Sequence, residues 1–326
     1  MHSNGVKRKS ACVLIPLRSC PAFVLTSILM QILWFCLGHP NILLAQELEP
    51  RAYSISPVGT NFVLLSYITS RGDLVFDPTL PIEDAKARIN ATAFCYFRSM
   101  NVFGRSGNAT IILPYTWGSA EGLLTGEAQR IYRSGLPDAR LRFAVNLMGA
   151  PAMDLADFAK YRQKTNIGAS LFLMIPTGQY DPAKLINLGS NRWTFKPEIG
   201  LSHAFARRWV LDVYAGVWLF TANNDFLGLK RTQKPLATTQ FHISYSVNPR
   251  LWAAFDGTFY AGGRTTVGGI LNADRQKNSR IGGTISLPLT RRQSLKLSYS
   301  RGVYVNIGGD FSTFAVAWQY LWGKGL

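Results

Sequence analysis

Charged side chains are scarce in this chain of 326 residues, since only 16% of them are Asp, Glu, Lys or Arg. Ordinary soluble domains hold about 25%. Acids are the scarcer kind, because 18 acidic residues stand against 35 basic ones and give a formal charge of +17. Hydrophobic residues make up 47% of the chain, which excludes a disordered protein. Few charges, 12% aromatic residues and 29 glycines favour β-structure with much of its surface hidden from water.

Cysteine and histidine are also rare. Three of the four cysteines lie in the first 40 residues, so Cys95 stands alone in the rest of the chain. One cysteine cannot form an internal disulfide or a cysteine zinc site. His203 and His242 are the only histidines beyond the first 40 residues, and they fall on separate predicted strands. We therefore expect neither a metal site nor a cofactor.

Motifs for nucleotide binding and catalysis are missing as well. The paired glycines at 262–263, 268–269 and 282–283 lack the Lys-Ser/Thr ending of a phosphate loop. A hydrolase stays open as an alternative, because His242 shares a face with nearby serines. Such an enzyme needs its nucleophile, base and orienting partner within hydrogen-bond reach. In outer-membrane lipases that site faces lipid, whereas His242 lies on a polar face. We predict no catalytic residues and no enzyme.

Residues 1–45 differ from the rest of the chain and are typical of a secretory signal peptide. Basic residues from Lys7 to Arg18 precede an apolar run of about 16 residues, and small residues follow. We expect cleavage after Ala45, which leaves 46–326 as a single domain. The alternative is an uncleaved anchor, although the run is shorter than the roughly 20 residues that span a bilayer. Either segment takes the chain out of the cytoplasm, so we expect no nucleic-acid partner despite the basic charge.

Alternation with a period of two, the pattern of β-strands, dominates the mature chain. In residues 237–248 one face reads Ala, Thr, Phe, Ile, Tyr, Val and the other Thr, Gln, His, Ser, Ser, Asn. A short helix is predicted over Ala152–Tyr161. About twelve strands are predicted, near 60–70, 85–98, 107–117, 137–148, 164–176, 191–204, 208–221, 236–248, 250–262, 278–289, 293–305 and 311–322.

An even number of strands, joined alternately by tight turns and mostly longer segments, predicts an up-and-down antiparallel barrel. Outer-membrane barrels have short periplasmic turns and longer external loops. A sheet in a bilayer must close to pair its backbone groups. Aromatic residues near strand ends fit an interfacial belt, among them Trp209, Trp252 and Trp318. We predict an all-β, closed transmembrane barrel in the outer membrane, with a soluble exported β-barrel that binds a ligand as the alternative.

Several segments resemble one family of outer-membrane proteins, named for the MetA pathway of phenol degradation. Asn166–Pro182 reads NIGASLFLMIPTGQYDP and resembles its strand followed by Pro-Thr-Gly and Tyr. Asn187–Phe205 continues with Gly-x-Asn-x-Trp and Lys-Pro-Glu-x-Gly, Ile111–Trp117 resembles its Leu-Pro-Tyr strand, and Ile281–Gly302 its late hairpin. The resemblance covers about 55–322. It implies an outer-membrane barrel that admits aromatic or other small hydrophobic compounds.

A transport path needs polar groups that replace water around a solute without trapping it. The polar strand faces supply the candidates for this path, and most are basic, which would favour anionic solutes such as aromatic carboxylates. The alternative is that they fill the lumen and satisfy one another, for example Arg142 or Lys196 with Glu198 or Asp256. The candidates are Lys86, Arg88, Arg140, Arg142, Lys196, Glu198, Gln240, His242, Asp256, Arg280 and Lys296.

The leading functional hypothesis is an outer-membrane channel for passive passage of small, aromatic or anionic solutes. A packed structural or receptor barrel without transport is the second. Partial filling fits both, because twelve strands lie between packed eight-stranded barrels and open 16-stranded porins. The expected partners are outer-membrane lipid, small hydrophobic or aromatic solutes and the outer-membrane assembly machinery.

Overall fold

The computed structural model describes residues 48–76, 82–248 and 250–323. The predicted signal peptide lies outside these residues. Twelve antiparallel strands form a closed barrel, as predicted. They are β1 (Thr60–Val75), β2 (Ile82–Val102), β3 (Arg105–Leu124), β5 (Ala139–Met148), β6 (Thr165–Ile175), β7 (Thr194–Phe205), β8 (Trp209–Phe220), β11 (Leu236–Ser246), β12 (Trp252–Gly262), β15 (Gln276–Pro288), β16 (Gln293–Val305) and β17 (Gly308–Gly323).

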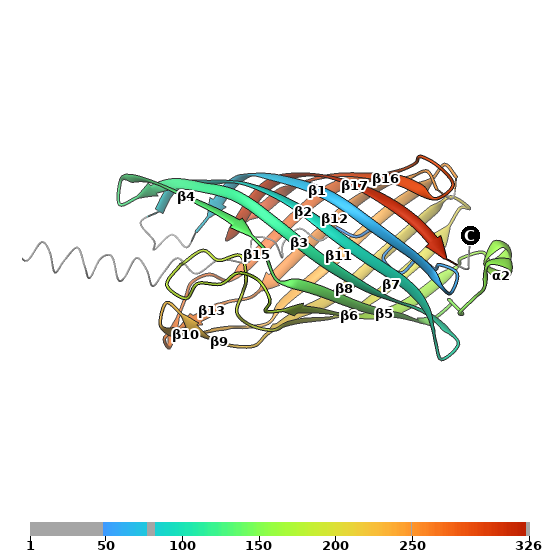
Figure 1. Ribbon diagram of the computed structural model, residues 1–326, viewed down its shortest axis with the longest axis horizontal. Coiled ribbons are helices and arrows are strands. Elements are labelled where there is room, and N and C mark those ends of the chain that lie inside the picture. Colours follow the sequence, from blue (N-terminus) through green and yellow to red (C-terminus); the bar gives the residue numbers. More distant parts are fainter. Residues whose placement is uncertain (1–47, 77–81, 249, 324–326) are drawn as a thin grey trace, which may run out of the picture.

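Closure comes from the pairing of the first strand with the last. β1 and β17 stay in antiparallel register from Thr60 opposite Gly323 to Val75 opposite Gly308. Every other barrel strand pairs with its neighbours along the chain, so no barrel edge is left open. This matters in a bilayer, where an unpaired backbone group costs several kcal/mol. Figure 1 shows the strands tilted across the long axis of the molecule.

Most of the short connections lie at one end of the barrel and most of the long ones at the other, apart from the connection between β5 and β6 and the tight turn between β16 and β17. Tight turns join β7 to β8, β11 to β12 and β15 to β16 at the end where β1 begins and β17 finishes. The opposite end carries the longer connections, with four short strands paired into a small sheet and β4 extending β3 beyond the barrel. These are β4 (Glu127–Gly135), β9 (Asn223–Phe226), β10 (Leu229–Gln233), β13 (Thr265–Val267) and β14 (Ile270–Leu271). Following the usual arrangement, the turn end is periplasmic and the other extracellular.

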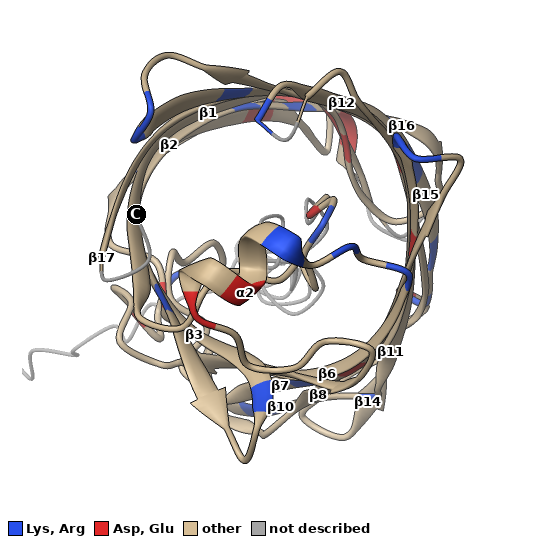
Figure 2. Cartoon of the chain, turned by 90° about the vertical axis from the view of Figure 1, so that its right-hand side faces the viewer, with Lys and Arg blue, Asp and Glu red and all other residues tan. Residues whose placement is uncertain are grey.

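The predicted helix is present and is shorter than expected. α2 (Leu155–Lys160) lies in the periplasmic connection between β5 and β6. Asp154 caps it by accepting a hydrogen bond from the backbone N–H of Asp157. Seen from the periplasmic end, α2 projects across the opening of the barrel (Figure 2). No helix in the described part of the chain is long and apolar enough to cross a membrane.

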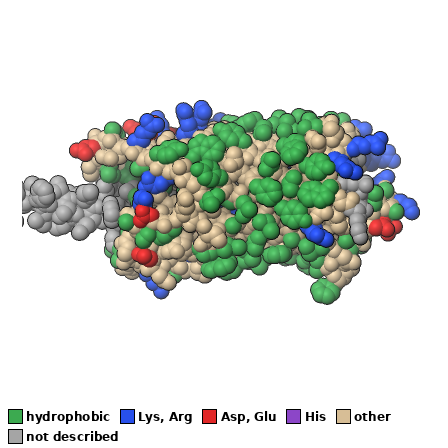
Figure 3. Space-filling model, viewed as in Figure 1, with side chains coloured by type: hydrophobic (Ala, Val, Ile, Leu, Met, Phe, Trp, Pro, Cys, Tyr) green, Lys and Arg blue, Asp and Glu red, His purple; other side chains and the backbone are tan. Residues whose placement is uncertain are grey.

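The outside of the barrel is a belt of apolar side chains. Figure 3 shows hydrophobic residues over the middle of the barrel and Lys and Arg side chains towards both ends. Leu65, Phe94, Ile199 and Ile243 alternate with inward-facing neighbours and are 38–58% exposed, and many others of the belt are similarly exposed. An apolar patch that encircles a closed sheet has one stable environment, the hydrocarbon layer of a membrane. The protein therefore spans the outer membrane.

The expected aromatic belt is confirmed in part. At the periplasmic end Trp318, Tyr320 and Trp322 stack in sequence on the outer face of β17. Trp252 does not belong to this belt, because its ring lies inside the barrel below the guanidinium of Arg51, 4.6 Å away. The position of an aromatic residue at a strand end does not tell whether its ring faces lipid or the lumen. The ring of Trp252 faces the lumen, where it contacts the Arg51 guanidinium.

Candidate functional site: the barrel lumen

The barrel interior has two unlike walls. The inner faces of β5, β6, β7, β8, β11, β12 and β15 form what we call the polar wall, which contains many fully buried polar side chains. They include Arg142, Asn146, Ser170, Lys196, Glu198, Ser202, Asp212, Gln240, His242, Ser244, Asp256, Thr258, Arg280 and Thr284. Alternation explains this set, because each polar residue is followed by an outward residue that meets lipid.

The inner faces of β17, β1, β2 and β3 form the apolar wall. All four strands are fully described, and none of them directs a charged side chain inward. Phe62 stacks on Phe97 across β1 and β2 with ring centroids 4.1 Å apart. Many of the apolar members are half-buried rather than buried, so open space lies beside them: Phe62, Leu64, Ile68, Ala93, Cys95, Phe97, Ile112, Pro114, Ala315, Ala317 and Leu321.

Charges of the polar wall are paired deep in the interior. Lys196 Nζ lies 3.0 Å from Glu198 Oε2, and both side chains are almost inaccessible to water. His242 Nδ1 lies 2.7 Å from Asp256 Oδ1, and the second oxygen of Asp256 accepts a hydrogen bond from Thr284 Oγ1. Such pairs are stable out of water only when their remaining polar atoms are also satisfied. The pairing of Lys196 with Glu198 is one that the sequence already offered.

Residues 48–59, here called the N-terminal segment, run inside the barrel against the polar wall. The backbone N–H of Arg51 donates to Asp212 Oδ2, and that of Ala52 donates to Tyr214 Oη, both over 3.1 Å. The Arg51 guanidinium donates to Ser244 Oγ and Ser246 Oγ. The segment thus uses polar groups of β8 and β11 that would otherwise face the lumen, and it fills part of the cross-section.

Tyr53 holds the centre of the N-terminal segment. Its hydroxyl lies 3.0 Å from Ser170 Oγ and donates to Glu198 Oε1 over 3.2 Å. The ring lies over Gly168 and Gly200, where an added Cβ would come within 2.3 and 2.1 Å of ring carbons. Burial, followed by the nearby Glu198 carboxylate, raises the pKa of Tyr53 to about 12. The two glycines therefore make room for one tyrosine ring, which remains neutral at ordinary pH.

The periplasmic foot of the N-terminal segment is fixed separately. Ile55 packs with Ala150 and Met153, which belong to the connection that carries α2. The Val58 N–H donates to the Met153 carbonyl over 2.8 Å. Ser99 Oγ donates to the Pro57 carbonyl and accepts from the Thr60 N–H. These contacts join the segment to the start of β1, so it enters the lumen from the periplasmic side.

Nine of the eleven predicted path residues lie on inner faces, namely Arg140, Arg142, Lys196, Glu198, Gln240, His242, Asp256, Arg280 and Lys296. Lys86 and Arg88 do not, and their predicted orientation is wrong. On β2 the alternate residues Ala87 and Ala91 are buried inside, while Lys86 and Arg88 are exposed outside. The physical reason is that β2 has 21 residues and rises beyond the membrane, where an outward charge meets water rather than lipid.

Sequence reasoning missed the residues that hold the N-terminal segment. Asp212 and Tyr214 lie at alternate positions of β8, so the period of two could have placed them inside. Arg51 and Tyr53 precede the first strand and follow no periodic pattern. The serines considered for a hydrolase are engaged elsewhere: Ser244 and Ser246 bind Arg51, and within the described residues no hydrogen bond joins His242 to a serine.

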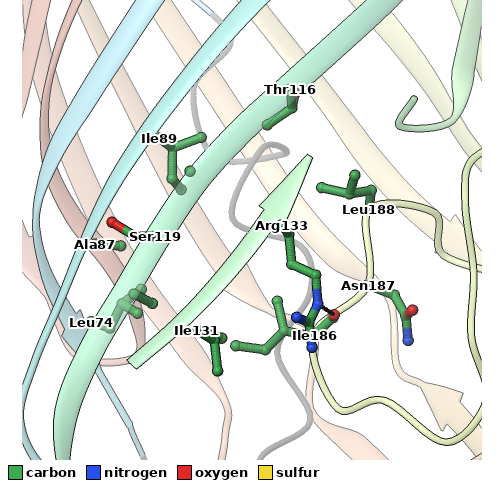
Figure 4. A pocket seen from close by; sticks show the side chains of 12 residues that line it. Leu74, Ala87, Ile89, Thr116, Ser119, Ile131, Arg133, Ile186, Asn187 and Leu188 are labelled. Carbon is green, nitrogen blue, oxygen red and sulfur yellow. Dashed lines mark hydrogen bonds between the residues drawn. The ribbon is translucent and has the colours of Figure 1, made fainter. Parts of the chain in front are cut away.

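A small apolar cavity of about 80 Å³ lies inside the extracellular mouth (Figure 4). Leu74, Ile89 and Ile131 line one side, and Ile186 and Leu188 line the other. Arg133 closes its edge by donating from Nε to the Ile186 carbonyl over 3.0 Å. An engineered cavity that holds benzene measures about 150 Å³. As it stands, this cavity admits part of a small apolar solute and not a whole aromatic ring.

Comparison with known proteins agrees with this fold. A search of curated proteins found no match. An outer membrane channel from Pseudomonas putida F1 superimposes with a TM-score of 0.73 over 85% of this chain and 100% of that one, at 20% identity. The transport unit of the autotransporter AIDA-I from Escherichia coli gives a TM-score of 0.50 over 90% and 97% of the two chains, at 10% identity.

A family model also matches the sequence itself. It covers residues 69–319, which is most of the chain and nearly the whole barrel. These residues include the segments around Pro176-Thr177-Gly178 and Lys196-Pro197-Glu198 that suggested the resemblance. The chain belongs to the family described as "Putative MetA-pathway of phenol degradation".

Proposed function

We propose that the protein is a passive outer-membrane channel for small amphipathic solutes, with aromatic carboxylates as the fitting class. Membership of the family and the likeness of the barrel to an outer membrane channel support a channel. The observation that carries the solute class is the pair of unlike walls. A flat apolar group fits the half-buried side chains of the apolar wall, and a carboxylate fits the cations opposite.

Charge in the lumen favours the anionic class. Three cations, Arg142, Lys196 and Lys296, lie inside the lumen, each 4.7–5.9 Å from the centroid of an aromatic ring. Glu49 of the N-terminal segment interacts electrostatically with Arg142 and Lys296. An anionic solute would take the place of this carboxylate. Fixed charge in a constricted path selects ions by their sign.

Passage requires the N-terminal segment to move, because it fills the lumen beside the polar wall. Its contacts there are mainly hydrogen bonds, and each such bond contributes only about 0.5–1.5 kcal/mol net. A solute that supplies its own carboxylate and ring to the same groups offsets much of that loss. We propose that the described state is the closed one and that displacement of the segment opens the path.

The test is uptake by liposomes that contain the purified barrel. We expect the barrel to raise the entry rate above that of protein-free liposomes more for benzoate than for benzyl alcohol, a neutral aromatic of similar size. The double variant Arg140→Gln/Arg142→Gln should lose most of that preference, and salt should weaken it in the wild type through screening. Arg98→Gln/Arg301→Gln removes the same charge from exposed outer-face positions and serves as the matched control.

Two results would contradict the proposal. If the lumenal double variant changes both fluxes equally, the lumenal charge does not select the solute. If the wild type accelerates the entry of neither solute above that of protein-free liposomes, the packed barrel that serves as structure or receptor becomes the better hypothesis.

A further inference from the structure

A groove on the outer surface of the barrel carries a cluster of cations. It lies where β1, β2, β3 and β4 rise at the extracellular end, and its volume is about 490 Å³. Arg71, Lys86, Arg88 and Arg130 line it together with two acids, Asp73 and Glu121. The outer-face positions of Lys86 and Arg88, unexpected from the sequence, are part of this groove. We call it the outer groove.

Cross-strand register divides the outer groove into a balanced and an unbalanced part. Lys86 lies opposite Asp73 on β1 and opposite Glu121 on β3, while Arg130 of β4 also lies opposite Glu121. Nearer the membrane, Arg71 lies directly opposite Arg88. Like charges at directly opposed positions destabilise a sheet. At this pair, the protein without a ligand carries more positive charge than the neighbouring acidic residues compensate.

No carboxylate among the described residues forms an ion pair with either of these arginines. The ion pairs found in residues 48–76, 82–248 and 250–323 within 4.0 Å do not include Arg71 or Arg88. Ser119 of β3, opposite Arg88, is neutral. Two adjacent guanidinium groups with ten N–H donors between them match the geometry of a phosphate, which accepts from arginine in a bidentate manner.

The depth of the pair in the membrane fits a lipid headgroup. Trp117 lies opposite Asn90 on β2. Asn90 is the next outer-face residue after Arg88 and the second after Lys86, on the membrane side of both. Two residues along a tilted strand rise roughly 5 Å along the membrane normal. The headgroup layer beyond the hydrocarbon is about 5–8 Å thick on each side. Arg88 therefore lies just outside the aromatic belt, at the level where lipid phosphates are found.

Aromatic rings at the lower rim complete the site. Tyr67 and Trp117 lie 6.2 Å apart by ring centroid, and the Tyr67 hydroxyl donates to Asn90 Oδ1 over 2.9 Å. Trp117 and Tyr132 both line the outer groove. Flat rings of this kind pack against sugar rings or the first carbons of acyl chains, so the groove offers cations for phosphate beside apolar faces for the rest of a headgroup.

We propose that the outer groove binds the phosphorylated glycolipid of the outer leaflet, with a sugar-bound phosphate held between Arg71 and Arg88. The extracellular position selects this lipid, because the outer leaflet of an outer membrane is built from it. Arg130 and Lys86 lie farther out and meet additional headgroup phosphate. The bound lipid neutralises the opposed arginines and fixes the extracellular ends of β2 and β3, with β4, against the membrane surface.

The test is binding of purified lipid A to the detergent-solubilised barrel, measured by native mass spectrometry. We expect Arg71→Gln/Arg88→Gln to bind bisphosphorylated lipid A at least tenfold more weakly than the wild type. Chemically dephosphorylated lipid A should bind the wild type weakly. It should bind the variant with the same weak affinity. Arg98→Gln/Arg105→Gln, at the periplasmic end of the same hairpin, should bind lipid A within twofold of the wild type. Heat-modifiable migration on gels confirms that each variant is folded.

Three outcomes would overturn the proposal. Equal binding of lipid A by the wild type and the Arg71/Arg88 variant would remove the two arginines from the site. Equal binding of phosphatidylglycerol and lipid A would show a general attraction to anionic lipid. Displacement of lipid A by low millimolar inorganic phosphate would show a simple anion site on the barrel surface.

Discussion

The polar and apolar walls enclose one lumen, but alternation along their strands separates inside from outside in different ways. On the polar wall, alternation separates inside from outside: Ser244 is inaccessible to water, while its neighbour Ile243 is 38% exposed towards lipid. On the apolar wall the same period separates two apolar faces, so that inward Ala93 stands beside outward Phe94. The difference teaches that polarity alone does not tell the inside of a membrane barrel from its outside.

Filling explains why the two walls differ. Buried polar groups cost free energy unless they are hydrogen-bonded, and the N-terminal segment supplies donors and a ring to the polar wall through Arg51, Ala52 and Tyr53. The apolar wall has no buried charged groups that need a partner, and its small residues leave space in the lumen. Most of the segment therefore lies against the polar wall, and its start at Glu49 comes near the apolar wall beside Cys95.

Removal of the N-terminal segment should have the largest effect. Deleting residues 48–56 should raise the single-channel conductance in planar bilayers severalfold, because the cross-section beside the polar wall becomes open to water. The barrel should still form, since its strands pair without the segment, and heat-modifiable migration checks this. An unchanged conductance would mean that the solute path does not pass along the polar wall.

Arginine substitutions on adjacent residues of β2 should separate the faces of the apolar wall. Phe94→Arg places a charge in lipid near mid-strand and should cost about 2–4 kcal/mol of folding free energy. Ala93→Arg points into free lumen and should cost clearly less. Folding yields in lipid vesicles across a urea series measure both, and equal costs would show that the two faces are assigned wrongly.

The same pair of substitutions on β11 should behave differently. Ile243→Arg should resemble Phe94→Arg, because both residues face lipid. Ser244→Arg should also be costly, because Ser244 accepts a hydrogen bond from Arg51 Nε and has no room for a longer side chain. A well-tolerated Ser244→Arg variant would mean that the N-terminal segment leaves the polar wall easily, and the contrast between the two walls would then be weaker than the contacts suggest.

Strand count, closure and the polar wall could be predicted from the sequence, and the physical reason is local. Each transmembrane strand must present one face to lipid, so a segment such as 237–248 carries its orientation in its own residues. The short helix was also predictable, because Asp154 and the following apolar spacing are local signals. The family resemblance rested on ordered motifs and pointed to the same barrel.

The remaining features depend on relations between distant residues. Lys86 and Arg88 belong to a strand whose length, rather than its pattern, decides what its outer face meets. The place of Tyr53 is set by Gly168 and Gly200 on two other strands. Nothing in the residues before β1 repeats or alternates, so no sequence pattern could have led to a segment inside the lumen.

Cys95 offers a probe of the open side, since it is the only cysteine in the described residues and lies on the inner face of β2. A small water-soluble methanethiosulfonate should label it slowly in the wild type and severalfold faster once residues 48–56 are deleted, because Glu49 and its neighbours then no longer lie near the thiol. Mass spectrometry of the intact protein follows the modification. Equal rates in the two proteins would place the segment away from the apolar wall at all times.

The smallest expected effect is an alkaline loosening of the N-terminal segment. Burial and the nearby Glu198 raise the pKa of Tyr53 from 10.0 to about 12, so the folded state favours the neutral phenol. A group with a raised pKa contributes its stabilisation fully below pH 10 and loses it as the pH rises towards 12. Conductance of the wild type should therefore be flat below pH 10 and increase between pH 10 and 12.

Tyr53→Phe is the matched control for this pH dependence. It keeps the ring over Gly168 and Gly200 but has no proton to lose, and it gives up the hydrogen bonds to Ser170 and Glu198. We expect its conductance to be slightly above that of the wild type at neutral pH, in line with the loss of about 0.5–1.5 kcal/mol for each buried hydrogen bond. The conductance of the variant should not increase between pH 10 and 12, because the variant has no tyrosine at this position to ionise. A rise of equal size in both proteins would assign the effect to other groups, such as the surface lysines, and would leave Tyr53 as a purely steric wedge between the two glycines.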